Sequence, residues 1–143
     1  MKKCVVIGVT GGIAVYKALD IISALKKKDI DVRVIMTESA TKFVNPITFQ
    51  SLSNNAVAVD TFQEIKVHEI QHISLAQRAD LMLIAPATAN IIGKVANGIA
   101  DDMLSTTIMA CKSKVIFAPA MNTNMYENRI VQDNIEKLKG YGY

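Results

Sequence analysis

Thr88 and Asn90 are polar side chains whose types and spacing suggest ligand binding. They follow an unbroken apolar run, residues 81–85, of the kind found in strands buried on both faces of a sheet. Pro86 should end this strand because it has no N–H group for the sheet ladder. Thr88 has the side chain of a helix N-cap, and a helical pattern continues from it to Gly98. A hydroxyl, an amide and a helix N-terminus therefore meet beyond the carboxyl end of a strand, where open parallel sheets bind ligands. We expect an anion, or a ring with hydrogen-bond acceptors, to bind there.

A glycine-rich turn, Thr10-Gly11-Gly12, suggests a phosphate as ligand. Together with Gly8 its spacing is G-x-x-G-G, which matches neither the dinucleotide fingerprint nor a P-loop with its lysine and hydroxyl. The alternative is that a turn from strand to helix simply needs glycine for a positive φ angle. The turn alone leaves both interpretations open.

Polar residues at the end of the second predicted strand favour a mononucleotide. Thr37 and Ser39 offer hydroxyl groups that suit a mononucleotide phosphate or the edge of an isoalloxazine ring. Glu38, between them, would instead suit the ribose of a dinucleotide. On balance these residues favour flavin mononucleotide (FMN) over NAD as the cofactor.

Strands and helices alternate along the chain and must position these residues. The apolar patterns predict strands at residues 4–9, 31–36, 56–59, 81–85 and 114–118. They predict helices at residues 13–28, 39–43, 47–52, 72–77, 101–111 and 128–139. The stripe of the first helix should consist of Ile13, Tyr16, Leu19, Ile22 and Leu25. Strand–helix–strand units of this kind give right-handed crossovers and a parallel sheet. The predicted fold class is α/β, a three-layer αβα domain with an open, Rossmann-like parallel sheet of about five to six strands.

The composition indicates one domain that binds neither membranes nor nucleic acid. The chain has 143 residues, 50% of them hydrophobic, but no apolar run near the roughly 20 residues of a membrane span. The net charge is only +3 and there is no tryptophan, which gives little support to nucleic-acid binding. Cys4 and Cys111 form no metal-ligand or redox motif. We expect a cytoplasmic protein.

Four motifs occur together along the chain. They are T-G-G-I-A-x-Y-K at 10–17, H-I-S-L at 72–75, P-A-T-A-N-x-x-G-K-x-A-N-G-I-A-D-D at 86–102 and P-A-M-N-x-x-M-Y at 119–126. In this combination and order the sequence resembles the homo-oligomeric flavin-containing cysteine decarboxylases. The resemblance covers nearly the whole chain.

The resemblance implies FMN-dependent decarboxylation of 4'-phosphopantothenoylcysteine to 4'-phosphopantetheine in coenzyme A biosynthesis. In that reaction the substrate thiol is oxidised to a thioaldehyde, CO₂ is lost, and the reduced flavin returns the hydride. A homotrimer, or a dodecamer of trimers, is also implied, with FMN bound between subunits. The same resemblance implies a fused C-terminal synthetase domain as a partner, which this chain does not include.

Functional residues of the family can be carried over onto this sequence one by one. The catalytic histidine falls on His72, which could take a proton near neutral pH. The substrate-recognition residues fall on Asn122 and Met125, and the amide of Asn122 would hold the substrate carboxylate. An uncharged donor suits a step in which that negative charge leaves. The flavin contacts fall on Gly11, Gly12, Ile13, Thr37, Ser39, Thr88, Ala89, Asn90 and Ala120. No metal ligand is implied.

His72 and Asn122 also have purely structural interpretations. His72 could be a helix cap or a surface residue, and Asn122 could simply cap a helix. A metal site of His68, Glu69 and His72 is disfavoured because no further ligand is placed beside them.

Other polar and sulfur-containing residues of the motifs have purely structural interpretations as well. Met121 and Met125 could fill gaps in the core. Asp101 and Asp102 should begin a helix, where the dipole favours them, and Lys94 should be solvated rather than bound to a phosphate or a neighbouring subunit.

The sequence departs from the family pattern in two places. Tyr126 stands where the family usually has tryptophan, and neither Cys4 nor Cys111 matches the proton-donating cysteine of the family's substrate flap. That flap and a last strand should follow Tyr143, so we expect residues 1–143 to be a single flavin-binding decarboxylase domain truncated before them.

Two other functions remain open. A peptidyl-cysteine decarboxylase of the lantibiotic type would share the histidine and a similar asparagine motif. A non-catalytic, flavin-binding regulatory subunit would use the same fold. A flavin prenyltransferase ranks lower, since it would not be expected to keep the P-A-M-N motif.

Overall fold

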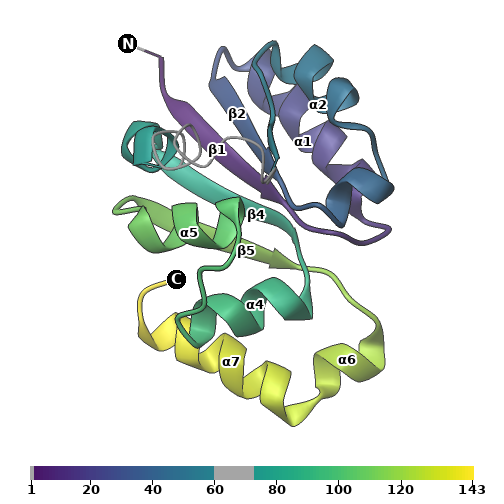
Figure 1. The fold of residues 1–143 in the computed structure, drawn as a ribbon, viewed down its shortest axis with the longest axis vertical. Coiled ribbons are helices and arrows are strands. Elements are labelled where there is room, and N and C mark those ends of the chain that lie inside the picture. The colour runs from purple at the N-terminus through teal and green to yellow at the C-terminus, as the bar shows by residue number, and fades with distance from the viewer. Residues whose placement is uncertain (1, 60–72) are drawn as a thin grey trace.

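Five parallel strands form one open sheet in the order β3-β2-β1-β4-β5 (Figure 1). The structure is a computed structural model that describes residues 2–59 and 73–143. The strands are β1 (Cys4–Val9), β2 (Asp31–Met36), β3 (Ala58–Val59), β4 (Leu81–Ala87) and β5 (Lys114–Pro119). Strands β2 and β3 are added on one side of β1, and β4 and β5 are added on its other side. The strand order therefore switches at β1, between the two halves of the sheet.

Helices cover both faces of this sheet, which confirms the predicted three-layer α/β fold. They are α1 (Val15–Lys27), η1 (Ala40–Lys42, a 3₁₀ turn), α2 (Pro46–Ser53), α4 (Ala89–Ala96), α5 (Met103–Ala110), α6 (Thr123–Glu127) and α7 (Arg129–Gly140). Residues 73–78 are also helical. Helices α1 and α2 lie on one face, and α4, α5 and α7 lie on the other (Figure 1). In the part of the chain that the structure describes, no helix is both long and apolar enough to span a bilayer.

Burial of both faces explains why the central strands are almost continuously apolar. In β1 the side chains of Val5 and Ile7 pack with α1 and α2, whereas Cys4 and Val6 pack with α5. This alternation follows from the two-residue repeat of a strand. Ile7 and Val6 are completely inaccessible to solvent, and each buried side chain of this size stabilises the fold by about 1.5–3 kcal/mol.

The prediction that Pro86 ends the central strand is wrong. Strand β4 continues to Ala87, which pairs with Pro119 of β5. The pairing with β5 is shifted between Ile84 and Ala87, and Pro86 lies within this irregularity. A strand tolerates proline at such a position because the ladder there does not require its missing N–H group.

The predicted buried stripe of α1 is wrong in two positions. Ile13 is 81% exposed and Tyr16 is 52% exposed, and the side chains buried against the sheet are Val15, Ala18 and Ile22. Ile13 precedes the first helical residue, and Tyr16 is one residue (about 100°) around the helix from Val15. Both residues are therefore turned toward the carboxyl edge of the sheet rather than its face.

Candidate functional site

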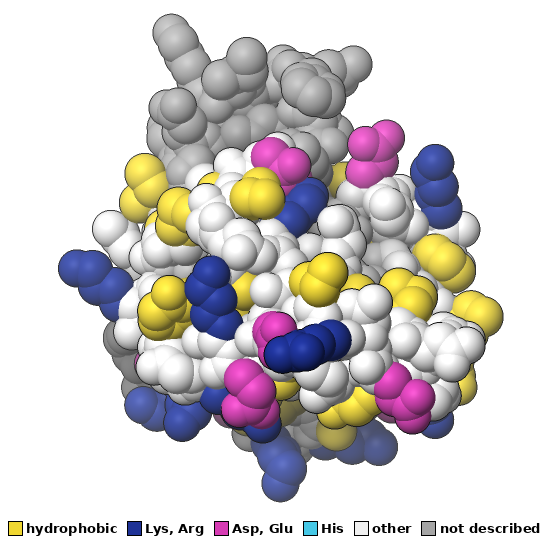
Figure 2. All heavy atoms as spheres, turned by 90° about the horizontal axis from the view of Figure 1, so that it is seen from below, with side chains coloured by type: hydrophobic (Ala, Val, Ile, Leu, Met, Phe, Trp, Pro, Cys, Tyr) yellow, Lys and Arg dark blue, Asp and Glu magenta, His cyan; other side chains and the backbone are white. Residues whose placement is uncertain are grey.

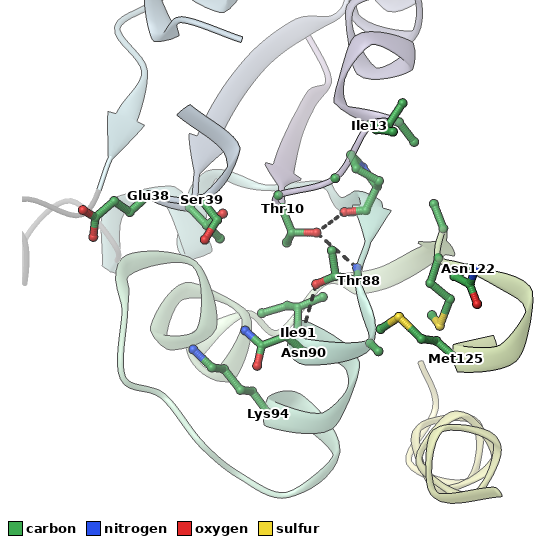
Figure 3. A pocket seen from close by; sticks show the side chains of 18 of the residues that line it. Thr10, Ile13, Glu38, Ser39, Thr88, Asn90, Ile91, Lys94, Asn122 and Met125 are labelled. Atoms are coloured by element: carbon green, nitrogen blue, oxygen red, sulfur yellow. Dashed lines mark hydrogen bonds between the residues drawn. The ribbon is translucent and has the colours of Figure 1, made fainter. Parts of the chain in front are cut away.

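The carboxyl edge of the sheet opens into a cavity of about 1030 Å³ (Figure 3). Every described residue of the predicted site lines this cavity: Gly11, Gly12, Ile13, Thr37, Ser39, Thr88, Ala89, Asn90, Ala120, Asn122 and Met125. The structure thus brings together three of the four motifs with the end of β2, although the role of each residue stays a prediction. His72, the predicted catalytic residue, lies outside the described residues, as do His68 and Glu69.

Thr10 connects the glycine turn with the start of α4. Its side chain is buried, and its hydroxyl donates to the carbonyl oxygen of Pro86 at 2.5 Å. The same hydroxyl oxygen accepts from the N–H of Thr88 at 3.1 Å. The sequence placed Thr10 only in the glycine turn and did not predict these two hydrogen bonds. The sequence feature that could have indicated this role is a hydroxyl residue directly between a buried strand and two glycines.

The N-termini of two helices face the cavity. Thr88 caps α4 as predicted, with its hydroxyl oxygen 3.3 Å from the N–H of Ile91. Helix α1 has no side-chain cap, because its N-cap residue is Ala14. The N–H groups of Val15 and Lys17 already donate to the carbonyl oxygens of Gly12 and Ala14, both at 3.0 Å. In the first turn of α1, the N–H of Tyr16 is therefore the donor left to offer to an anion.

Glycine is needed at position 11 because the backbone of the turn lies close to Ser39. Neither Gly11 nor Gly12 has a positive φ angle, so the interpretation that the turn needs glycine for a positive φ angle is wrong. A Cβ atom at Gly11 would lie 2.6 Å from the Cβ of Ser39 and 3.0 Å from its backbone carbonyl carbon. At Gly12 an added Cβ would meet no atom within 4 Å. The turn is therefore pressed against the end of β2 at its first glycine and open at its second.

The wall opposite the glycine turn consists of α6, which was not predicted as a separate helix. The side-chain oxygen of Asn122 accepts from the N–H of Asn124 at 2.9 Å, so Asn122 caps α6. Met121 packs partly against the core, but Met125 is 50% exposed. The interpretation of Met125 as a core residue is therefore wrong, and it faces the cavity (Figure 3).

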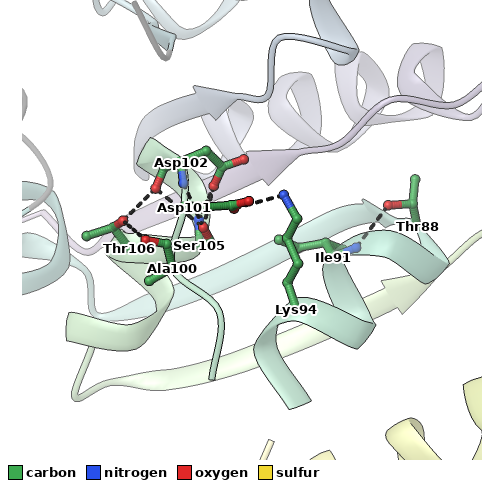
Figure 4. Close-up of polar contacts among 8 residues, drawn as sticks. All are labelled: Thr88, Ile91, Lys94, Ala100, Asp101, Asp102, Ser105 and Thr106. Carbon is green, nitrogen blue, oxygen red and sulfur yellow. Dashed lines mark hydrogen bonds and ion pairs between the residues drawn. The ribbon is translucent and has the colours of Figure 1, made fainter. Parts of the chain in front are cut away.

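A charged cluster forms a further part of the cavity wall (Figure 4). The ammonium group of Lys94 lies 2.9 Å from the carboxylate of Asp101, with 21% of the Lys94 side chain exposed. This hydrogen bond raises the pKa of Lys94 and lowers the pKa of Asp101. Lys94 is thus paired and not freely solvated. Asp102 begins α5 as predicted, in a reciprocal capping box with Ser105.

Neither cysteine lies in the cavity wall. Cys4 begins β1 at the opposite edge of the sheet, and burial raises the pKa of its thiol to about 11. Cys111 follows α5 and is half-buried. Neither cysteine is among the residues that line the cavity.

The sequence model of the Flavoprotein family matches residues 1–143, and the chain belongs to this family.

Two bacterial proteins and one solved structure are similar to this chain. The chain is 54% identical over 139 residues to the coenzyme A biosynthesis bifunctional protein CoaBC of Bacillus subtilis, covering 97% of this chain and 34% of that protein. It is 45% identical over 145 residues to the Streptococcus mutans protein named "Probable phosphopantothenoylcysteine decarboxylase", covering 100% of this chain and 81% of that protein. The solved structure of the FMN-dependent cysteine decarboxylase SpaF is similar with a TM-score of 0.89 and 29% identity, covering 99% of this chain and 81% of that one. The chain thus spans about a third of the Bacillus protein.

The residues around the cavity fit a flavin. A volume of about 1030 Å³ is at the upper end of small-molecule pockets. The uncapped start of α1 suits a phosphate group, and the open side of Gly12 leaves room beside it. Thr88 and Asn90 add polar groups, and Lys94 lies one helix turn beyond Asn90.

Proposed function

We propose that this chain binds FMN in the cavity and decarboxylates 4'-phosphopantothenoylcysteine to 4'-phosphopantetheine, a step of coenzyme A biosynthesis. The observation that carries the proposal is the convergence of three separate motifs on one cavity at the carboxyl edge of the sheet. The name of the Streptococcus relative and the FMN-dependent SpaF structure support the substrate and the cofactor, respectively.

Each wall of the cavity has a part in this proposal. The bound flavin would supply a two-electron acceptor that is restored within the cycle, so that loss of CO₂ is not a net oxidation. The N–H donor at the start of α1, with Thr37 and Ser39, would hold the phosphate. Asn122 and Met125 on α6 would orient the cysteine end of the substrate. His72 would take the proton of the substrate thiol.

Assembly is a further proposal. Ile13 and Tyr16 are largely exposed beside the cavity, although they are apolar and aromatic. Covering them with a second copy of the chain would remove apolar surface from water and close the cavity. We propose a homotrimer, or a dodecamer of trimers, in the cytoplasm.

The extent of the domain is also a proposal. β5 lies at the end of the described sheet, and its Ile116 is 41% exposed. A further strand beside β5 would bury this side chain, and we propose that residues 1–143 belong to one decarboxylase domain completed by that strand and a substrate flap. The much longer Bacillus relative supports a fused synthetase domain as its partner.

The test is to load the protein with FMN and follow the mass of 4'-phosphopantothenoylcysteine incubated with it. Loss of CO₂ alone supports the complete reaction. A product that is also two hydrogens lighter indicates a cycle that stops before reduction. Turnover only of a peptide with a C-terminal cysteine would indicate the peptidyl-cysteine decarboxylase. Bound FMN without any change in mass would indicate a regulatory flavoprotein.

A further inference from the structure

Helix α6 forms one wall of the cavity but has almost no core of its own. It has five residues, none of which is buried, and with its cap it carries Asn122 and Met125. A helix this short is not stable by itself in water. Its position must therefore come from contacts at its two ends.

The start of α6 is anchored to the sheet. The N–H of Ala120 donates to the carbonyl oxygen of Ala87 at 3.1 Å, directly beyond the paired ends of β4 and β5. This bond fixes the point where the chain leaves the sheet, and Met121, the next residue, packs partly against the core.

The end of α6 is held by α7. The side-chain amide of Gln132 donates to the carbonyl oxygen of Tyr126 at 2.5 Å. Tyr126 is in the last turn of α6, where carbonyl groups lack partners within the helix. Asn128 caps the start of α7 at the same corner, through its side-chain oxygen and the N–H of Ile130 at 2.9 Å.

Helix α7 is in turn docked on α4, the helix that begins at the cavity. Leu138 is buried and Ile135 packs against the same core cluster. At the exposed edge of this contact, the side-chain amide of Asn97 donates to the side-chain oxygen of Asn134 at 3.4 Å, and its oxygen accepts from the ammonium group of Lys137 at 3.3 Å. The outer face of α7 carries charged side chains among hydrophobic ones (Figure 2). Helix α4 thus holds α7 in place, and α7 contacts the end of α6 through Gln132.

We propose that Gln132 is a positioning residue that sets the distance between the two walls of the cavity by fixing the end of α6. Gln132 is not among the residues that line the cavity. Asn122 and Met125 line the cavity from the α6 side, and Thr88 and Asn90 line it from the start of α4 (Figure 3). The effect on substrate rests on the proposed function, whereas the effect on α6 does not.

The test replaces Gln132 by Met, which keeps the length of the side chain, and by Glu, which removes the donor. The matched control is Asp133→Asn on the exposed face of the same helix. The carboxylate of Asp133 makes only a long, solvent-exposed contact with Arg129, at 4.0 Å. KM and kcat for 4'-phosphopantothenoylcysteine, FMN affinity and amide hydrogen exchange are measured on the FMN-loaded protein. In both Gln132 variants we expect KM to rise about three- to tenfold, as for one lost hydrogen bond. FMN affinity and kcat should stay close to those of the control, and amides 123–127 should exchange faster.

The outcomes separate the two proposals. If both Gln132 variants match the control in KM and in exchange at 123–127, the positioning role is overturned. If they lose FMN and unfold, Gln132 stabilises the fold as a whole and the proposal is equally wrong. If the unaltered protein does not turn over the substrate, the proposed function fails, and the exchange of 123–127 alone decides the role of Gln132.

Discussion

Individual residues set the distances between loops at the rim of the cavity. Thr10 joins the end of β1 to the start of α4 through two hydrogen bonds of one buried hydroxyl. Gly11 lets the next turn approach Ser39 more closely than any larger residue would. Because these contacts are made within the protein, their loss should show in stability as well as in ligand binding.

Substitution of Thr10 by Val should destabilise the fold. Val has nearly the same shape but leaves the carbonyl of Pro86 without its donor and the N–H of Thr88 without its acceptor. Unsatisfied buried groups of this kind cost about 1–3 kcal/mol in the free energy of unfolding. Urea unfolding measures this loss, and Thr10→Ser, which keeps the hydroxyl, should recover most of it. Equal stability of the Val and Ser variants would contradict the role of the hydroxyl.

The two glycines of the turn should respond differently to alanine. Gly11→Ala places a methyl group against Ser39 and its backbone, and overpacking of this kind costs about 1–3 kcal/mol. Gly12→Ala meets no protein atom within 4 Å, so its melting temperature should stay unchanged while the methyl group narrows the cavity. Thermal unfolding and FMN titration of both variants test this contrast. Equal melting temperatures would show that the turn can move away from β2.

At the scale of elements, the sequence predicted nearly all of the fold because most of the information is local. The apolar runs and helical caps placed β1, β2, α2 and α7 within one or two residues. The role of Pro86 was missed because a register shift depends on the neighbouring strand. Helix α6 was missed because five residues without a buried side chain leave no apolar period to detect. The paired state of Lys94 depends on the fold of the loop that brings Asp101 back to α4.

This loop should make a small, pH-dependent contribution to stability. The pKa of Asp101 is lowered by its hydrogen bond to Lys94, so the ion pair stabilises the fold above the ordinary value of 3.8. The contribution disappears as the pH falls through the lowered pKa. The pKa of Lys94 is raised, so the contribution is complete below 10.5 and disappears as the pH rises through the raised value. Between these limits Asp101→Asn should lose less than about 1 kcal/mol, since Asp101 is mostly exposed.

Urea unfolding of this variant and the unaltered protein at several pH values measures the difference. Asp29→Asn is the control, because Asp29 pairs with Lys2 at 2.8 Å on an open surface remote from the cavity. A difference for Asp101→Asn that persists at a pH well below the lowered pKa of Asp101, where its carboxylate is protonated, would mean that the side chain acts through something other than its charge.

At the scale of the whole molecule, the cavity wall carries apolar side chains that remain largely exposed in the described part of the chain. Ile13, Tyr16 and Met125 line it and are each at least half exposed. A small flavin could cover part of this surface, but Ile13 stands out from the uncapped start of α1. In the proposed assembly, a second copy of the chain would cover these exposed side chains.

If the neighbouring copy completes the cavity, FMN affinity must depend on protein concentration. Dissociation to monomers would expose Ile13 and Tyr16 and open the site to water, so dilution should release FMN while the sheet, which is internal to one chain, stays folded. Sedimentation monitored in the flavin absorption band, with circular dichroism at the same concentrations, measures assembly, cofactor and fold separately. Ile13→Ser should shift FMN release to higher protein concentration by weakening assembly. Ile130→Ser should not, because Ile130 is also largely exposed but lies in the first turn of α7, outside the cavity wall. A monomer that keeps its FMN on dilution would show that the cavity of one chain is sufficient.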